Sequence, residues 1–165
     1  MPQLAADPIL VVADIHLGRK QHGDKKTGPG IDWALGTLDR GAEAGARHLV
    51  MLGDVIDRKR FTDSTYGEVA RFFQRGVELF DTVVFIAGNH DVHHDLAGII
   101  PGGVIVARQE PQTIRAGGWA LHTAAVEVDR DSRRLVPEFP APVEEALDLG
   151  LLHTSVTGEY SNNPC

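Results

Sequence analysis

The sequence predicts an α/β fold with parallel strands, because strand-like and helix-like segments alternate along the chain. Short apolar runs rich in β-branched residues predict buried strands at 9–13, 48–52 and 82–87. Between them, apolar residues recur with helical spacing at 31–46 and 65–80. A strand–helix–strand–helix–strand order implies parallel strands joined by right-handed crossovers.

The pattern changes after Gly98, where short strand candidates are separated by glycine and proline and no comparable helix follows. These candidates predict a second sheet packed on the first, and they lie at 104–106, 112–114, 119–122 and 149–153. The proline-containing, highly charged segment 129–148 reads as a surface loop. We therefore expect one domain spanning 1–165.

Composition narrows the class of protein. The chain is 42% hydrophobic and 24% charged, which is ordinary for a soluble globular domain. It has no apolar run of about 18 residues, no signal-peptide pattern, and a single cysteine, Cys165, which together predict a cytoplasmic protein without membrane contact. The net charge of −7 argues against a general electrostatic grip on nucleic acid.

Metal-ligand residue types follow each of the predicted strands. Asp14 and His16 follow the first strand, Asp54 the second and Asn89 the third, while His153 ends a later strand. We expect the first two side chains to converge, because residues two apart on an extended chain point the same way. The carboxyl ends of parallel strands meet at one edge of a sheet, where open α/β folds place their sites.

The residue types favour a pair of divalent ions. Carboxylate, imidazole and amide oxygen suit Mn²⁺, Mg²⁺, Fe²⁺ or Zn²⁺, and without a nearby cysteine a structural zinc site is not expected. Two ions about 3.5–4 Å apart need a shared ligand, and one carboxylate can span them. Asp54, on the middle strand of the three, is the natural bridge.

Three ordered motifs resemble those of the calcineurin-like metallophosphoesterase superfamily: Asp-x-His, Gly-Asp-x-x-Asp-Arg and Gly-Asn-His-Asp. The strings at 13–18 (Ala-Asp-Ile-His-Leu-Gly) and 150–155 (Gly-Leu-Leu-His-Thr-Ser) resemble its bacterial DNA-repair exonuclease branch. This branch is related to the nuclease partner of Rad50-type ATPases. The resemblance implies a sandwich of two mixed β-sheets flanked by helices, and metal-dependent phosphodiester hydrolysis, most simply by a DNA exonuclease or endonuclease.

The resemblance also implies a role for each motif residue. Asp14 and His16 would hold the first ion, Asp54 would bridge, and Asn89 and His153 would hold the second. Mn²⁺ would be the first choice for both ions, and a metal-bound hydroxide would be the nucleophile.

Two further motif residues would act on the substrate instead of the metal. His90 would sit beside the scissile phosphate, where it would protonate the leaving oxygen or stabilise charge. Asp91 would orient the His90 ring. Asp57 and Arg58 are candidates for a supporting position near the ions, although Asp57 could simply hold Arg58 or cap the next helix. The alternative for His153 is a hydrogen-bonded core histidine at the end of an apolar strand, and the motif match favours the ligand role.

The chain departs from the family pattern in two places. The family's Gly-His-x-His motif, which supplies one ligand to each ion, does not follow His153, so we expect a domain incomplete at its C-terminus that holds about one ion or fewer. His122-Thr123 stands where the branch has a His-Gly pair. The histidines outside the motifs are expected to be surface or packing residues, namely His22, His48, His93, His94 and His122.

Basic residues in the loops after the first two ligand clusters favour a polyanionic substrate. These candidates for contacts with the DNA backbone are Arg19, Lys20, Lys25, Lys26, Lys59 and Arg60. DNA, a Rad50-type (SbcC-like) ATPase and a second copy of the chain are the expected partners. Two other functions remain open: a phosphodiesterase or phosphatase for a non-DNA phosphate ester, and a non-catalytic fragment without a complete metal site.

Overall fold

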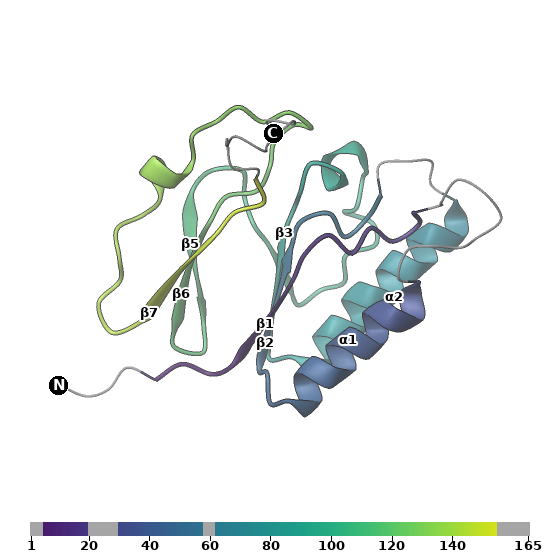
Figure 1. Ribbon diagram of the computed structural model, residues 1–165, viewed down its shortest axis with the longest axis horizontal. Coiled ribbons are helices and arrows are strands. Elements are labelled where there is room, and N and C mark those ends of the chain that lie inside the picture. The colour runs from purple at the N-terminus through teal and green to yellow at the C-terminus, as the bar shows by residue number, and fades with distance from the viewer. Residues whose placement is uncertain (1–4, 20–29, 58–61, 155–165) are drawn as a thin grey trace, which may run out of the picture.

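The computed structural model describes residues 5–19, 30–57 and 62–154, which form three layers (Figure 1). The central layer is a sheet of four parallel strands in the order β1-β2-β3-β4. These strands are β1 (Ile9–Val12), β2 (His48–Leu52), β3 (Thr82–Ile86) and β4 (Val104–Val106). Short apolar, β-branched runs suit such strands, because a central parallel sheet is covered on both faces.

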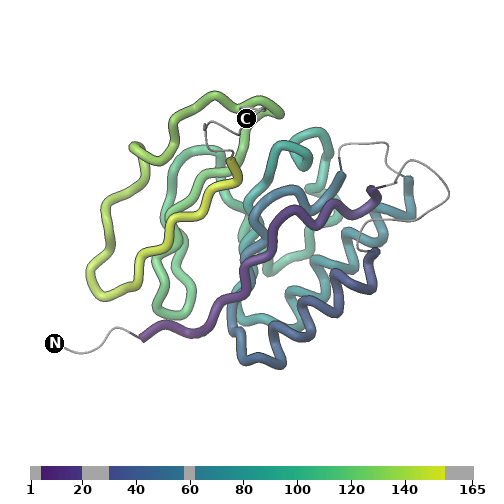
Figure 2. Tube along the Cα trace, viewed as in Figure 1, coloured from purple at the N-terminus to yellow at the C-terminus, as the bar shows by residue number. Residues whose placement is uncertain are grey.

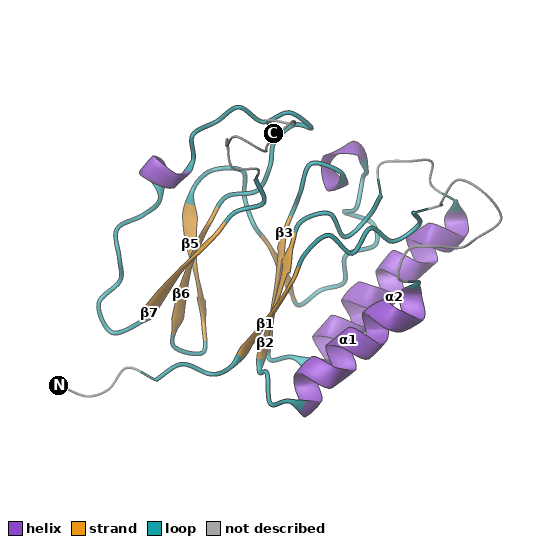
Figure 3. Ribbon diagram, in the orientation of Figure 1, coloured by secondary structure: helices purple, strands orange, loops and turns teal. Residues whose placement is uncertain are grey.

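Two helices cover one face of this sheet, α1 (Ile31–Glu43) and α2 (Asp63–Leu79) (Figure 3). Their apolar stripes face the sheet, and the ring of Phe73 meets that of Phe85 on β3 at 5.1 Å between centroids, edge to face. In the part of the chain described, no helix combines the length and apolar character needed to cross a bilayer.

A three-stranded sheet covers the other face, in the order β5-β6-β7. Strands β5 (Gln112–Ala116) and β6 (Trp119–Thr123) form an antiparallel hairpin, and β7 (Leu147–Leu151) pairs with β6 in parallel. The residues buried between the two sheets come from both, including Val50, Val84, Ile86, Leu121 and Leu151. Two short 3₁₀ turns complete the fold, η1 (Asp91–His93) and η2 (Val136–Glu138).

The α/β class, the two sheets and the flanking helices confirm the predicted fold, with two corrections. The 104–106 segment does not join the second sheet. It pairs in parallel with β3, because the connection after β3 crosses over the helix side and returns to the open edge. The last strand also begins and ends earlier than expected, so His153 lies beyond it. Its leucines alternate with more exposed residues, and Leu149 and Leu151 pack against the first sheet.

Candidate metal centre

The loops that follow β1, β2 and β3 come together at one edge of the first sheet, as the trace in Figure 2 shows. Three residues in these loops have left-handed backbone conformations, Asp14 at φ 54°, His16 at φ 49° and Asp54 at φ 52°. Such conformations cost non-glycine residues about 1 kcal/mol or more and cluster at functional sites. The first loop is also held against the second, since the His16 N–H donates to the Asp54 carbonyl at 2.9 Å.

Asp14 and His16 lie close together, but not for the reason that the sequence suggested. The extended backbone expected between them is wrong, because both residues are left-handed. The turn nevertheless brings Nε2 of His16 to 3.6 Å from Oδ1 of Asp14. The side chain of Asp14 is largely exposed, which leaves this edge of the site open.

Asp54 is the centre of the cluster. It is only 3% exposed, and three imidazoles face its two carboxylate oxygens. Nε2 of His16 lies 3.7 Å from Oδ2, Nε2 of His90 lies 3.8 Å from Oδ2, and Nε2 of His153 lies 3.4 Å from Oδ1. These separations exceed hydrogen-bond length. Donor atoms about 2.1 Å from one ion stand roughly 3.0–3.5 Å apart, so the separation between His153 and Asp54 fits a shared ion and those of His16 and His90 are slightly longer.

Donor atoms group around Asp54 in two sets. Asp14, Asp54 and His153 offer three atoms within 4.8 Å of one another, and so do His16, Asp57 and His90. The first set joins residues that the sequence assigned to different ions. The second set includes His90, which was expected to act on the phosphate.

His153 and Asn89 complete the edge. Oδ1 of Asn89 lies 3.1 Å from Nε2 of His153, while the other ring nitrogen of His153 lies 3.2 Å from the Leu52 carbonyl. That second contact turns Nε2 toward Asp54, as outer partners of metal-binding histidines do. Gly53 makes this packing possible, because a Cβ there would lie 2.2 Å from the His153 ring.

Asp91 occupies a different position from the one expected beside His90. Its carboxylate accepts N–H groups from Gly88 and Asp54 at 2.8 Å and from Ile56 at 3.2 Å, so it holds the second and third loops together. Burial raises the pKa of Asp91 to about 7, although the backbone N–H groups oppose that rise.

Asp57 is the carboxylate that lies against His90. Oδ1 of Asp57 is 3.2 Å from Nδ1 of the His90 ring. The backbone N–H of His90 separately donates to Oδ1 of Asp54 at 2.9 Å. The Asp57 carbonyl lies 3.2 Å from Nε2 of His94, a ring whose pKa is lowered by burial. His94, expected to be an ordinary packing residue, thus supports the loop that carries Asp57.

Sequence reasoning missed one residue at this edge, Asp129. Its Oδ1 accepts a hydrogen bond of 3.2 Å from Nδ2 of Asn89. It lies in the segment read as a surface loop, and no motif or strand ending marks it in the sequence.

Of the predicted basic residues, only Arg19 lies in the described part of the chain. Arg19 is exposed just after the first loop. Arg58 lies outside the described residues. So do the other predicted basic residues, which are Lys20, Lys25, Lys26, Lys59 and Arg60.

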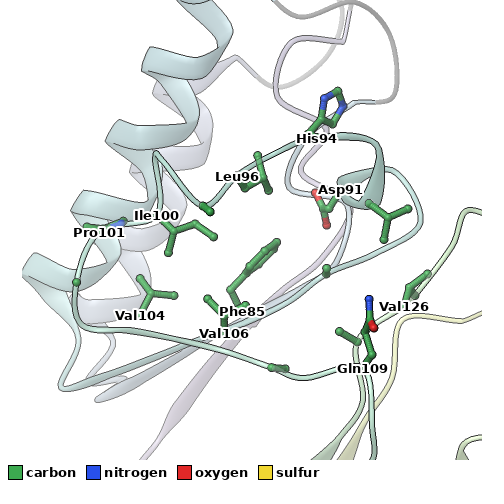
Figure 4. Close-up of a pocket in the computed structure, with 16 residues that line it drawn as sticks. Phe85, Asp91, His94, Leu96, Ile100, Pro101, Val104, Val106, Gln109 and Val126 are labelled. Atoms are coloured by element: carbon green, nitrogen blue, oxygen red, sulfur yellow. The ribbon is translucent and has the colours of Figure 1, made fainter.

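Two of the cavities near this edge of the sheet differ in size and in lining. The smaller, about 310 Å³, is lined by Asp14, Asp54, Asn89 and His153 and is the candidate site. The larger, about 560 Å³, is an apolar groove beside β4 lined by residues such as Phe85, Leu96 and Ile100 (Figure 4). His94 is at its rim, but the groove holds none of the proposed ligands. The candidate site is therefore not the largest cavity.

Comparisons with known proteins give a family match and distant likenesses to solved structures. Residues 7–126 match the model of the family described as calcineurin-like phosphoesterase. No curated protein matches the chain significantly in sequence.

The solved structures that resemble the chain include the Pseudomonas putida nuclease MPE, with 24% identity and a TM-score of 0.47. The likeness covers 86% of this chain and 59% of that one, so the chain spans less than two thirds of its length. A dimetal phosphatase from Danio rerio shows 14% identity and a TM-score of 0.44 over 69% of this chain and 43% of that one.

Proposed function

Because the chain belongs to the calcineurin-like phosphoesterase family, we propose that it carries the centre of a metal-dependent phosphodiesterase that hydrolyses DNA. The observation that supports this most strongly is the environment of Asp54. A buried carboxylate faces Nε2 of His16 at 3.7 Å and Nε2 of His153 at 3.4 Å, separations longer than usual hydrogen bonds and close to those of two ligands on one ion.

Five residues would hold two divalent ions. Asp14 and His16 would bind the first, Asn89 and His153 the second, and Asp54 would bind both. The donor set of carboxylate, imidazole and amide oxygen fits Mn²⁺ first, with Mg²⁺, Fe²⁺ or Zn²⁺ as alternatives. Bound ions of this kind lower the pKa of water and stabilise the charge that develops on the phosphate.

His90 would serve the substrate. Its Nδ1 lies 3.2 Å from Asp57, which fixes the ring and leaves Nε2 facing the interior of the site. From there, it could donate a proton to the leaving oxygen. Asp57 would therefore orient the His90 ring in place of Asp91, because the carboxylate of Asp91 holds the loops together.

The choice of DNA rests on the sequence. The strings around His16 and His153 resemble the DNA-repair exonuclease branch, and basic residues are concentrated in the two loops that leave this edge. A role in DNA repair, a cytoplasmic location, a Rad50-type ATPase partner and a homodimer belong to the same proposal.

Substrate competition tests the function. With Mn²⁺ present, the chain is expected to cleave linear duplex DNA in preference to bis-p-nitrophenyl phosphate, at a low rate because about one ion or fewer is expected per chain, and Asp54→Asn should abolish both activities. Cleavage of the small ester alone would favour a phosphodiesterase for non-DNA esters. Absence of both activities together with Mn²⁺ binding would favour a non-catalytic fragment.

A further inference from the structure

We propose that Asp129 is a positioning residue that fixes which end of the Asn89 amide faces the metal centre. The inference rests on the proposed function, in which Asn89 binds an ion. It assigns a role in the site to a segment that the sequence marks only as a charged loop.

The Asn89 side chain is held from both ends. Nδ2 donates to Oδ1 of Asp129 at 3.2 Å, and Oδ1 lies 3.1 Å from Nε2 of His153. The amide therefore lies between the loop carboxylate on one side and the candidate metal centre on the other.

The chemistry of the carboxylate decides the orientation of the amide. An ionised carboxylate only accepts hydrogen bonds, so only the NH₂ end of Asn89 can face Asp129 favourably. A flipped amide would place two oxygens against each other and present nitrogen to the ions. Only the amide oxygen is a ligand for a divalent cation. Asp129 thus selects the orientation in which Asn89 can bind.

The loop that carries Asp129 is anchored at both sides of that residue. Before it, the Val126 N–H donates to the Ala87 carbonyl, just after β3, at 3.1 Å. After it, Asp131 accepts the Glu127 N–H at 3.0 Å and forms an ion pair with Arg133.

Arg133 extends the anchor to the rest of the fold. It donates to the carbonyls of Ala125 at 3.0 Å and Gln109 at 2.9 Å. This network is what sets the position of Asp129, since a solvated loop of this length would not by itself hold a carboxylate at one place.

The second oxygen of Asp129 also has a neighbour, since Oδ2 lies 3.7 Å from Nε2 of His93. The side chain is 27% exposed, so it is partly shielded. Both oxygens thus face groups on the segment that follows β3, which distinguishes Asp129 from a freely solvated surface acid.

Mn²⁺ titration of the full chain by calorimetry, with three variants, tests the role. Asp129→Ala should weaken Mn²⁺ binding at Asn89 by roughly tenfold or more. That is the loss of affinity typical when a residue hydrogen-bonded to a metal ligand is removed. Asp129→Asn should restore most of the affinity, because its amide oxygen still accepts from Asn89. Glu138→Ala removes an exposed carboxylate from the same connection between β6 and β7, away from Asn89 and Arg133, and its affinity should match that of the parent chain.

The outcomes separate this inference from the proposed function. If the parent chain binds Mn²⁺ and Asp129→Ala binds it equally well, the positioning role is wrong and the metal centre stands. If Glu138→Ala or Asp129→Asn weakens binding as much as Asp129→Ala, the effect is one of charge and the role is again wrong. If the parent chain binds no Mn²⁺, the proposed function fails, and the inference fails with it.

Discussion

Histidine meets aspartate in two regions of this molecule, and the distances to the central carboxylate differ. On the second sheet, Nδ1 of His122 lies 2.9 Å from the Thr113 hydroxyl and Nε2 lies 2.7 Å from Oδ1 of Asp148. At the edge of the first sheet, the three imidazoles around Asp54 stop at 3.4–3.8 Å.

The difference separates a structural network from a site that can bind an ion. His122 makes direct hydrogen bonds through both ring nitrogens across regular strands β5, β6 and β7, so it joins them, and a single carboxylate faces it. At the metal edge, His153 also has partners for both ring nitrogens, but three rings converge on the one carboxylate of Asp54 at separations longer than usual hydrogen bonds. The backbone there is left-handed at Asp14, His16 and Asp54. Residue type alone would have made the two regions look alike.

The largest effect should come from Asp54→Ala. The change removes the carboxylate that faces all three imidazoles, so both ions should be lost. Hydrolysis should fall by at least about 10³-fold, since several kcal/mol of charge stabilisation go with the ions. Calorimetry with Mn²⁺ measures the binding directly. Binding equal to that of the parent chain would rule out Asp54 as the shared ligand.

His90→Ala should slow turnover and leave the metal in place. Loss of a general acid lowers kcat by roughly 10²–10⁴-fold. Elemental analysis after dialysis should find the metal content of the parent chain. A variant that loses metal would instead place His90 among the ligands, with His16 and Asp57, as the second group of donor atoms allows.

His122→Ala should destabilise the fold without affecting metal binding. The buried ring makes two hydrogen bonds, and its loss should lower the free energy of unfolding by about 1–3 kcal/mol in urea. His153→Ala is the matched variant on the metal edge and should weaken Mn²⁺ binding. If the two variants lose metal equally, the distinction between the regions is wrong.

Asp131→Asn should have a smaller effect that depends on pH. The hydrogen bond from Arg133 lowers the pKa of Asp131 from 3.8 to about 2. The stabilisation, about 2 kcal/mol, is therefore full above the unfolded-state pKa and is lost as pH falls through about 2. The stability difference between parent and variant, measured in urea, should shrink from pH 5 to about pH 2. A difference that stays constant over this range would contradict the pairing.

The elements of the first sheet could be predicted because their signals are local. Apolar runs and helical spacing place β1 to β3 and both helices within a few residues. The partner of β4 could not be predicted in this way. Val104–Val106 reads as a short strand in either sheet, and only the course of the crossover assigns it to β3.

For the candidate site too, the sequence predicts local features, and only the folded chain shows the rest. Ligand types at strand ends predicted that Asp14, His16, Asp54, Asn89 and His153 would meet, and the structure places them together. The left-handed turns could not be foreseen, since positive φ is uncommon in any residue other than glycine, and the enrichment of Asp and His there is too weak to mark single positions. The contact of Asp129 with Asn89 joins residues 40 positions apart through a loop without a motif, so only the folded chain reveals it.

Anomalous diffraction from crystals grown with Mn²⁺ would test the metal centre most directly. We predict manganese peaks within bonding distance of the Asp54 carboxylate, with Asp14 and His16 on one side and Asn89 and His153 on the other. No peak is expected beside His122 and Asp148. Manganese bound elsewhere in the described part of the chain, with none at Asp54, would contradict the assignment of this edge as the metal centre.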